Sequence, residues 1–142
     1  MSEFRTESDS MGELQVPTDA LYQAQTQRAV NNFRISDLVM PKQFITALAY
    51  IKQAAAQSNY ELGHLSKNKA QLIERACQEI IDGEHLEHFP IDIFQTGSGT
   101  STNMNANEVI ATLASRYSDE VIHPNDDVNM GQSSNDVIPS CI

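Results

Sequence analysis

Cysteine is scarce in this sequence, and the two cysteines present, Cys77 and Cys141, lie far apart. They form no CxxC pair and no cluster with histidine, which argues against a zinc site or an iron–sulfur cluster. Because Cys77 falls on the apolar stripe of an expected helix, we interpret it as a small core residue. The thiols therefore give no reason to expect a bound metal.

Long apolar runs are also missing, and their absence excludes a second class of protein. No run of about 18 or more apolar residues occurs, so the sequence predicts no membrane-spanning helix. The polar N-terminus, residues 1–7, lacks the basic-then-apolar order of a signal peptide. We expect a cytoplasmic protein that does not act at a membrane.

Basic residues are few: 9 lysines and arginines stand against 19 aspartates and glutamates, and the net charge is −10. A protein of this charge is a poor candidate for nonspecific nucleic-acid binding through a basic face. Its long-range field also repels anionic substrates. Any anion site must therefore rely on local donors, or on cations from elsewhere.

The composition that remains is globular, with 142 residues of which 40% are apolar, and it fits one domain. Apolar residues at helical spacing predict helices over residues 41–62, 67–82 and about 104–117. Pro41 suits a first helical turn, Ser66 an N-cap, and glycines 63 and 83 suit helix ends. The sequence therefore predicts a mainly α fold.

The other segments show weaker patterns. We expect residues 1–40 to form an extended arm followed by helical turns, with Thr18 or Asp19 capping a short helix through Ala20-Leu21-Tyr22. Residues 84–103 and 118–132 are expected to be irregular, and residues 133–136 can cap a further helix. Because the sequence stops just inside the apolar run 137–142, we expect a truncated chain.

The first of two polar clusters spans residues 95–105 and holds hydroxyls, amides and two glycines but no charged residue. It runs into an expected helix, whose first turn exposes N–H groups and a partial positive charge that attract carboxylates. Glycine lets the backbone approach an anion closely, and Ser98 and Thr100 can add hydroxyl donors. The alternative is a flexible loop followed by an ordinary N-cap, because glycine-rich loops are weak motifs.

The second cluster covers residues 123–129 and 132–136. His123 and Asp127 are four residues apart, so a metal pair on a helix is conceivable, but Pro124 favours a turn and no third ligand is evident. The end of the cluster offers neutral donors at another expected helix start. Two such starts can converge on one dianion, although spacing alone leaves open that the cluster only shapes a loop.

Together these stretches resemble the fumarase/aspartase superfamily, and in particular its metal-independent class II fumarases. The resemblance lies in residues 9–28, 96–108 and 123–136, with the motifs Ala24-Gln25-Thr26-Gln27, Gly97-Ser98-Gly99-Thr100 and His123-Pro124-Asn125-Asp126 in family order. Aspartases usually have alanine in place of Ser98, asparagine in place of His123 and threonine in place of Ser134. These details favour a fumarase.

The resemblance implies the helical N-terminal domain of this superfamily, with an extended arm and irregular loops. Residues 1–142 would be that domain, without the central helix bundle and the C-terminal domain. The resemblance also implies a homotetrameric lyase that hydrates fumarate reversibly to L-malate in the tricarboxylic acid cycle. No metal and no cofactor would be needed.

Motif positions imply the site residues. The substrate's carboxylate or hydroxyl groups would be bound by Ser98, Gly99, Thr100, Ser133, Ser134 and Asn135. A second anion site would comprise His123, Pro124, Asn125 and Asp126. Glu120 stands where some members carry an arginine of this second site, which is a departure from the family pattern.

The groups that transfer protons in the family are a histidine and a serine on a mobile loop, and neither segment occurs in this sequence. We therefore predict that this chain alone has no appreciable fumarase activity and binds dicarboxylates weakly or not at all. Two alternatives stay open, namely an aspartase-like ammonia lyase and a noncatalytic module that binds anions or mediates assembly.

Overall fold

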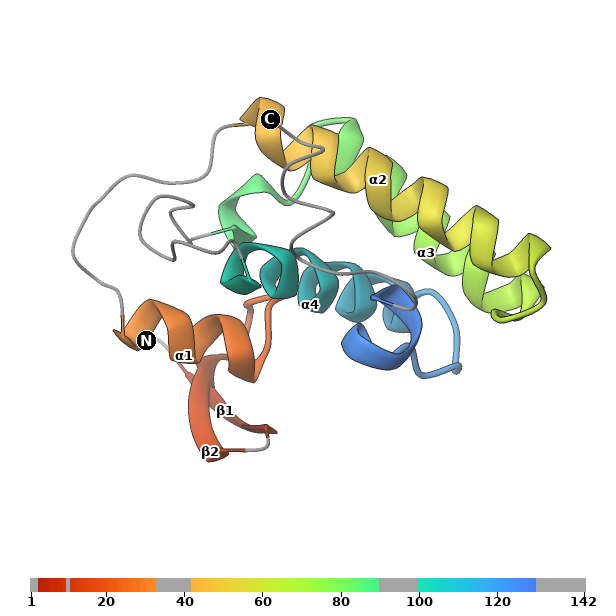
Figure 1. The fold of residues 1–142 in the computed structure, drawn as a ribbon. Helices are drawn as coiled ribbons and strands as arrows, with labels where there is room; N and C mark the ends of the chain where they lie inside the picture. Colours follow the sequence, from red (N-terminus) through yellow and green to blue (C-terminus); the bar gives the residue numbers. More distant parts are fainter. Residues whose placement is uncertain (1–2, 10, 33–41, 90–99, 130–142) are drawn as a thin grey trace.

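A central helix, α4, separates two parts of the structure. The computed structural model describes residues 3–9, 11–32, 42–89 and 100–129. A β-hairpin and helix α1 lie on one side of α4, and the helix pair α2 and α3 lies on the other (Figure 1). The elements are β1 (Phe4–Asp9), β2 (Gly12–Pro17), α1 (Ala24–Asn32), α2 (Lys42–Glu61), α3 (Lys67–Ile81), the short 3-10 helix η1 (Leu86–His88), α4 (Thr100–Arg116) and the single π-helical turn η2 (Pro124–Val128). The prediction of a mainly α fold is confirmed.

The N-terminal arm is extended, as expected, but its two halves pair as an antiparallel hairpin that the sequence did not predict. Phe4 lies opposite Pro17, and Asp9 lies opposite Gly12, whose φ of 122° suits glycine. Asp9 also forms an ion pair with Arg28 of α1, at 2.8 Å, and this ion pair lowers the pKa of Asp9. The hairpin is thereby fixed to the first helix.

The predicted short helix through residues 20–22 is wrong, because this segment is a turn and α1 begins at Ala24. The guanidinium of Arg5 donates to the carbonyl oxygens of Pro17, Thr18, Ala20 and Tyr22 at 2.7–3.0 Å. These hydrogen bonds satisfy the carbonyl oxygens of the segment without a helix. A side chain from β1 therefore overrides the local capping signal.

Helices α2 and α3 match the predicted ranges 41–62 and 67–82 to within a residue at each end. Ser66 caps α3, because its hydroxyl accepts the N–H of Lys69 at 3.2 Å. Gly63 and Gly83, with φ of 80° and 96°, follow the ends of the two helices. The apolar stripes of α2 and α3 meet in the core. Cys77 of α3 is completely buried there, and burial raises the pKa of its thiol.

Helix α4 begins at Thr100, about four residues earlier than predicted, and four of its polar residues are as buried as its apolar ones. Asn103, Asn105, Asn107 and Glu108 are each at most 3% exposed. Elements pack against α4 from both sides, and only its last residue, Arg116, is classed as exposed among the side chains described for this helix. Buried amides need partners, and Asn105 finds one in the carbonyl oxygen of His88 at 3.0 Å.

The segment after α4 contains one π-helical turn, η2, where the sequence predicted only a loop. The helix expected to follow residues 133–136 lies outside the described residues. Among the residues that the structure describes, no helix has the length and apolar character needed to cross a membrane.

Candidate functional site

The first polar cluster runs directly into a helix start, as predicted. Thr100 is the first residue of α4, so its segment carries the free N–H groups and partial positive charge of a helix N-terminus. Ser98 and Gly99, the other predicted ligands of this cluster, lie outside the described residues. The structure thus places Thr100 where a carboxylate can be bound by the helix start.

The second polar cluster is organised by Asp127 and not by a metal pair. The carboxylate of Asp127 accepts the backbone N–H of His123 at 2.9 Å and pairs with Lys69 of α3 at 3.3 Å. Pro124 is the first residue of η2, and the side chains of His123 and Asp126 are exposed. Among the described residues, His123 and Asp127 belong to no group of three metal-ligating side chains, so the structure gives this pair no third ligand.

Of the predicted second anion site, Asn125 lies within η2 between Pro124 and Asp126. His123 precedes this turn and Asp126 lies within it, and both residues are exposed. The predicted substrate ligands Ser133, Ser134 and Asn135 lie outside the described residues.

The two clusters meet through a pair of asparagines. Asn103 is the fourth residue of α4, and its amide nitrogen donates to Oδ1 of Asn129, at the end of η2, at 3.0 Å. Asn129 precedes Ser133 by four residues. The sequence alone left open whether the two helix starts converge, and this contact brings the described parts of the two clusters together.

A lysine that sequence reasoning missed joins the same contact. Lys52 of α2 is completely buried, and its ammonium donates to Oδ1 of Asn103 at 2.6 Å and to Oδ1 of Asn129 at 3.3 Å. A lysine on a helix is normally read as solvent-exposed. The signal that pointed to this residue was its place on the apolar face of α2, one turn after the buried Leu48.

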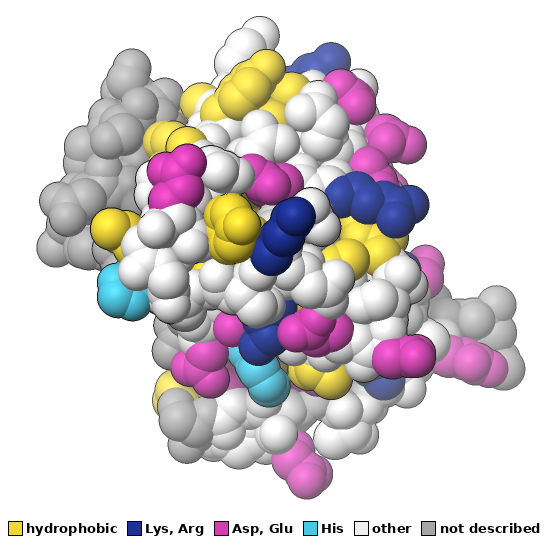
Figure 2. All heavy atoms as spheres, turned by 90° about the vertical axis from the view of Figure 1, so that its right-hand side faces the viewer, with side chains coloured by type: hydrophobic (Ala, Val, Ile, Leu, Met, Phe, Trp, Pro, Cys, Tyr) yellow, Lys and Arg dark blue, Asp and Glu magenta, His cyan; other side chains and the backbone are white. Residues whose placement is uncertain are grey.

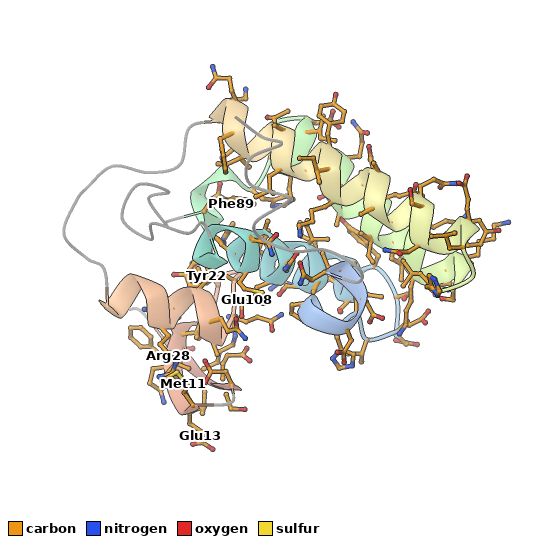
Figure 3. All side chains as sticks on the ribbon, viewed as in Figure 1. Met11, Glu13, Tyr22, Arg28, Phe89 and Glu108 are labelled. Carbon is orange, nitrogen blue, oxygen red and sulfur yellow. The ribbon has the colours of Figure 1, made fainter. Side chains whose placement is uncertain are left out.

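Glu108 is a second buried charged residue that the sequence did not reveal. Its carboxylate accepts the backbone N–H groups of Gln23, Gln25 and Thr26 at 2.9–3.0 Å, around the beginning of α1. Figure 3 shows Glu108 reaching from α4 toward this segment. Burial raises the pKa of Glu108, and the N–H donors oppose that rise. Glu108 therefore acts as the N-terminal cap of α1.

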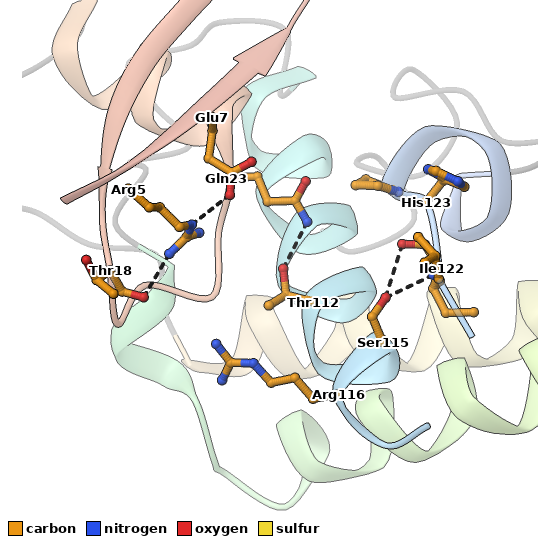
Figure 4. Close-up of a pocket in the computed structure, with 11 residues that line it drawn as sticks. Arg5, Glu7, Thr18, Gln23, Thr112, Ser115, Arg116, Ile122 and His123 are labelled. Carbon is orange, nitrogen blue, oxygen red and sulfur yellow. Dashed lines mark hydrogen bonds and ion pairs between the residues drawn. The ribbon is translucent and has the colours of Figure 1, made fainter. Parts of the chain in front are cut away.

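A cavity of about 410 Å³ lies between the hairpin, the second half of α4 and the segment that leads to η2 (Figure 4). Most polar groups around it already bind one another, as in the pairs Gln23–Thr112 at 2.9 Å and Ser115–Ile122 at 2.9 Å. Thr112 lies about 18 Å along the helix axis from Thr100. The cavity is therefore separate from the helix start that carries the first cluster.

One group of His and Glu side chains among the described residues has ligand atoms within 4.8 Å of one another, namely Glu79, Glu84 and His85. Glu79 already pairs with His85 at 2.8 Å and accepts a hydrogen bond from Tyr117. Burial of Glu79 opposes ionisation, but these bonds prevail and lower its pKa. Arg75 lies 3.9 Å from both Glu79 and the Tyr117 ring, so a cation is already present.

The surface charge agrees with the acidic composition. Figure 2 shows basic side chains separated by acidic ones on one face of the described residues, so this face offers no continuous positive patch. Attraction of an anion to this face would therefore depend on local donors.

Comparison with known proteins identifies relatives along the whole chain. A family model described as "Lyase" matches residues 12–142. A class II fumarate hydratase of Xylella fastidiosa (strain 9a5c) is 61% identical over 139 residues, which cover 98% of this chain and 29% of that protein. A class II fumarate hydratase of Halobacterium salinarum is 55% identical over 148 residues, covering 100% of this chain and 32% of the relative.

Solved structures agree with the fold. A fumarate lyase:delta crystallin structure from Brucella melitensis, bound to cobalt, superposes with a TM-score of 0.93 at 48% identity. Recombinant class II fumarase from Schistosoma mansoni gives a TM-score of 0.93 at 44% identity, covering 98% of this chain and 31% of that one. The chain therefore spans about a third of the length of the proteins that it matches.

Proposed function

Because this chain belongs to the lyase family whose model covers residues 12–142, we propose that the whole protein is a class II fumarate hydratase. Residues 1–142 are, in this proposal, its helical N-terminal domain, followed by a central helix bundle and a C-terminal domain. The observation that carries the proposal is the 61% identity over 139 residues to a class II fumarate hydratase.

The proposed reaction adds water across the double bond of fumarate, so that one carbon gains the hydroxyl group and the other gains the proton of L-malate. In reverse, proton removal beside a carboxylate leaves a carbanion, which is stabilised as a doubly charged carboxylate. Hydrogen-bond donors fixed at that carboxylate stabilise the developing charge, and a single preorganised donor contributes about 2.7–4 kcal/mol.

We assign this stabilising role to Ser98, Gly99 and Thr100 at the start of α4 and to Ser133, Ser134 and Asn135. The start of α4 at Thr100 and the contact between Asn103 and Asn129 support the assignment. Residues 123–126 form the proposed second anion site. In the family a histidine and a serine transfer the protons, and neither of their segments occurs in this sequence, so the proposed site also needs residues that this sequence does not contain.

The remaining features of the proposal follow the family. We propose a cytoplasmic homotetramer that works in the tricarboxylic acid cycle, with fumarate and L-malate as its small-molecule partners. It uses neither metal nor cofactor, and nucleic acid is not a partner.

An assay of the protein encoded by the complete gene tests the proposed function. The purified protein is incubated separately with fumarate, L-malate and L-aspartate, and the products are quantified. We expect interconversion of fumarate and L-malate in the presence of a chelator, with no ammonia released from aspartate. Ammonia release without malate formation would identify an aspartase, and no conversion of any substrate would favour a noncatalytic module.

A further inference from the structure

Lys52 is the most deeply buried cation among the described residues, and its environment is specific. Its side chain is 0% exposed, and burying an ammonium group is costly unless hydrogen bonds compensate the lost water. Two of its acceptors are the side-chain oxygens of Asn103 and Asn129, at 2.6 and 3.3 Å. Asn103 in turn donates to Asn129 at 3.0 Å, so the three side chains close a ring of contacts.

This ring joins three elements that the sequence keeps far apart. Lys52 comes from α2, Asn103 from the first turn of α4, and Asn129 from the end of η2. Asn103 follows Thr100 by three residues, or about 4.5 Å along the helix axis. The ammonium group therefore lies beneath the helix start that carries the proposed carboxylate ligands.

The charge of Lys52 has the same sign as the partial charge of that helix start. A helix N-terminus carries roughly half a positive elementary charge, so the ammonium group and the helix start contribute positive charge to the same region. A bound dianion is attracted by both of them. The arrangement is therefore favourable for an anion site.

The overall charge makes such a local cation useful. With a net charge of −10, this chain repels a dianion at long range. Inside the protein, where the effective dielectric constant is low, a single charge acts more strongly than it does at the surface. A buried lysine next to the site can therefore offset part of the repulsion.

We propose that Lys52 is a positioning residue of the dicarboxylate site, which holds Asn103 and Asn129 together and supplies positive charge beneath the start of α4. The inference rests on the function proposed above. Lys52 does not need to touch the substrate, because it acts through Asn103 and through the field at the helix start.

Two variants of the full-length protein separate charge from geometry. Lys52→Met removes the ammonium group but keeps an unbranched side chain that reaches the position of Cε. Asn129→Asp keeps an acceptor for both Lys52 and Asn103 but cancels the local positive charge. Lys67→Met is the control, because Lys67 is an exposed lysine at the start of α3 and its removal changes the net charge by the same amount as Lys52→Met.

Steady-state kinetics with fumarate and thermal unfolding are measured for each variant. We expect the KM for fumarate to rise roughly tenfold in both Lys52→Met and Asn129→Asp, with a smaller change in kcat. Lys67→Met should leave both constants unchanged. If Lys52→Met fails to fold, Asn129→Asp decides, because it keeps the hydrogen-bond acceptor.

A folded Asn129→Asp variant with an unchanged KM would overturn the role of Lys52, and so would a rise in KM of the same size in Lys67→Met. Loss of kcat with unchanged KM would also count against it. If the wild-type full-length protein does not hydrate fumarate, the proposed function itself fails, and this inference fails with it.

Discussion

At the scale of single residues, His88 couples the stability of the N-terminal part to pH. Its Nδ1 accepts the backbone N–H of Leu21 at 3.1 Å, which requires this nitrogen to be unprotonated. Burial lowers the pKa of His88 below the ordinary 6.5, although Glu87 opposes the shift. The unfolded chain therefore binds more protons than the folded chain just below pH 6.5, and stability is lost as the pH falls through this range.

We predict that acidification from about pH 7.5 to 5.5 lowers the free energy of unfolding of the wild-type chain more than that of His88→Asn. Asparagine can place an oxygen near the position of Nδ1 but does not titrate. Urea denaturation at both pH values measures the difference. An equal loss of stability in the two proteins would show that His88 is not responsible.

In the candidate site, the sequence predicted features that depend on neighbouring residues and missed those that depend on distant ones. The first polar cluster was correctly placed at the beginning of a helix, because hydroxyls and glycines before an apolar stripe are a local signal, but that helix starts at Thr100 and not at about residue 104. The role of Lys52 was missed, because its partners lie 51 and 77 residues away in the sequence. The local signal for Lys52 was its place on the apolar face of α2, and that signal does not identify its distant partners.

At the scale of elements, the correct predictions concern helices that are determined by local sequence, and the incorrect ones concern elements that are determined by distant residues. Helices α2 and α3 were predicted closely, since their periodicity, the Ser66 cap and the glycines at their ends are encoded locally. The start of α1 was placed wrongly because Arg5 and Glu108 determine it from distant elements. The hairpin was missed for a related reason, since its pairing depends on contacts between strands.

The cap of α1 gives a prediction at this scale. Glu108→Gln replaces one acceptor oxygen by an amide nitrogen, so at least one buried N–H at the start of α1 loses its partner. We expect a loss of about 1–3 kcal/mol in the free energy of unfolding. Urea denaturation measures it, with Glu13→Gln as the control, since Glu13 is an exposed residue of the hairpin. The control should change stability by less than about 0.5 kcal/mol.

If Glu108→Gln proved as stable as Glu13→Gln, the three N–H groups at the start of α1 would have to find other acceptors. The capping role of Glu108 would then be wrong.

At the scale of the whole molecule, the described residues hold only part of the proposed site. The chain carries neutral donors and the buried Lys52, but its net charge is −10 and it lacks the proton-transferring segments of the family. We predict that residues 1–142 alone do not interconvert fumarate and L-malate. The purified chain is assayed beside the full-length protein at equal molar concentration, and sustained turnover by the short chain would contradict the prediction.

We propose that the start of α4 at Thr100 helps to hold a small dicarboxylate for hydration. The most direct test compares the kcat/KM for fumarate of the full-length protein with that of its Thr100→Ala variant. We expect the wild type to form L-malate and the variant, still folded, to lose about 100-fold or more in kcat/KM. An unchanged kcat/KM in the folded variant would show that Thr100 does not help to hold the dicarboxylate.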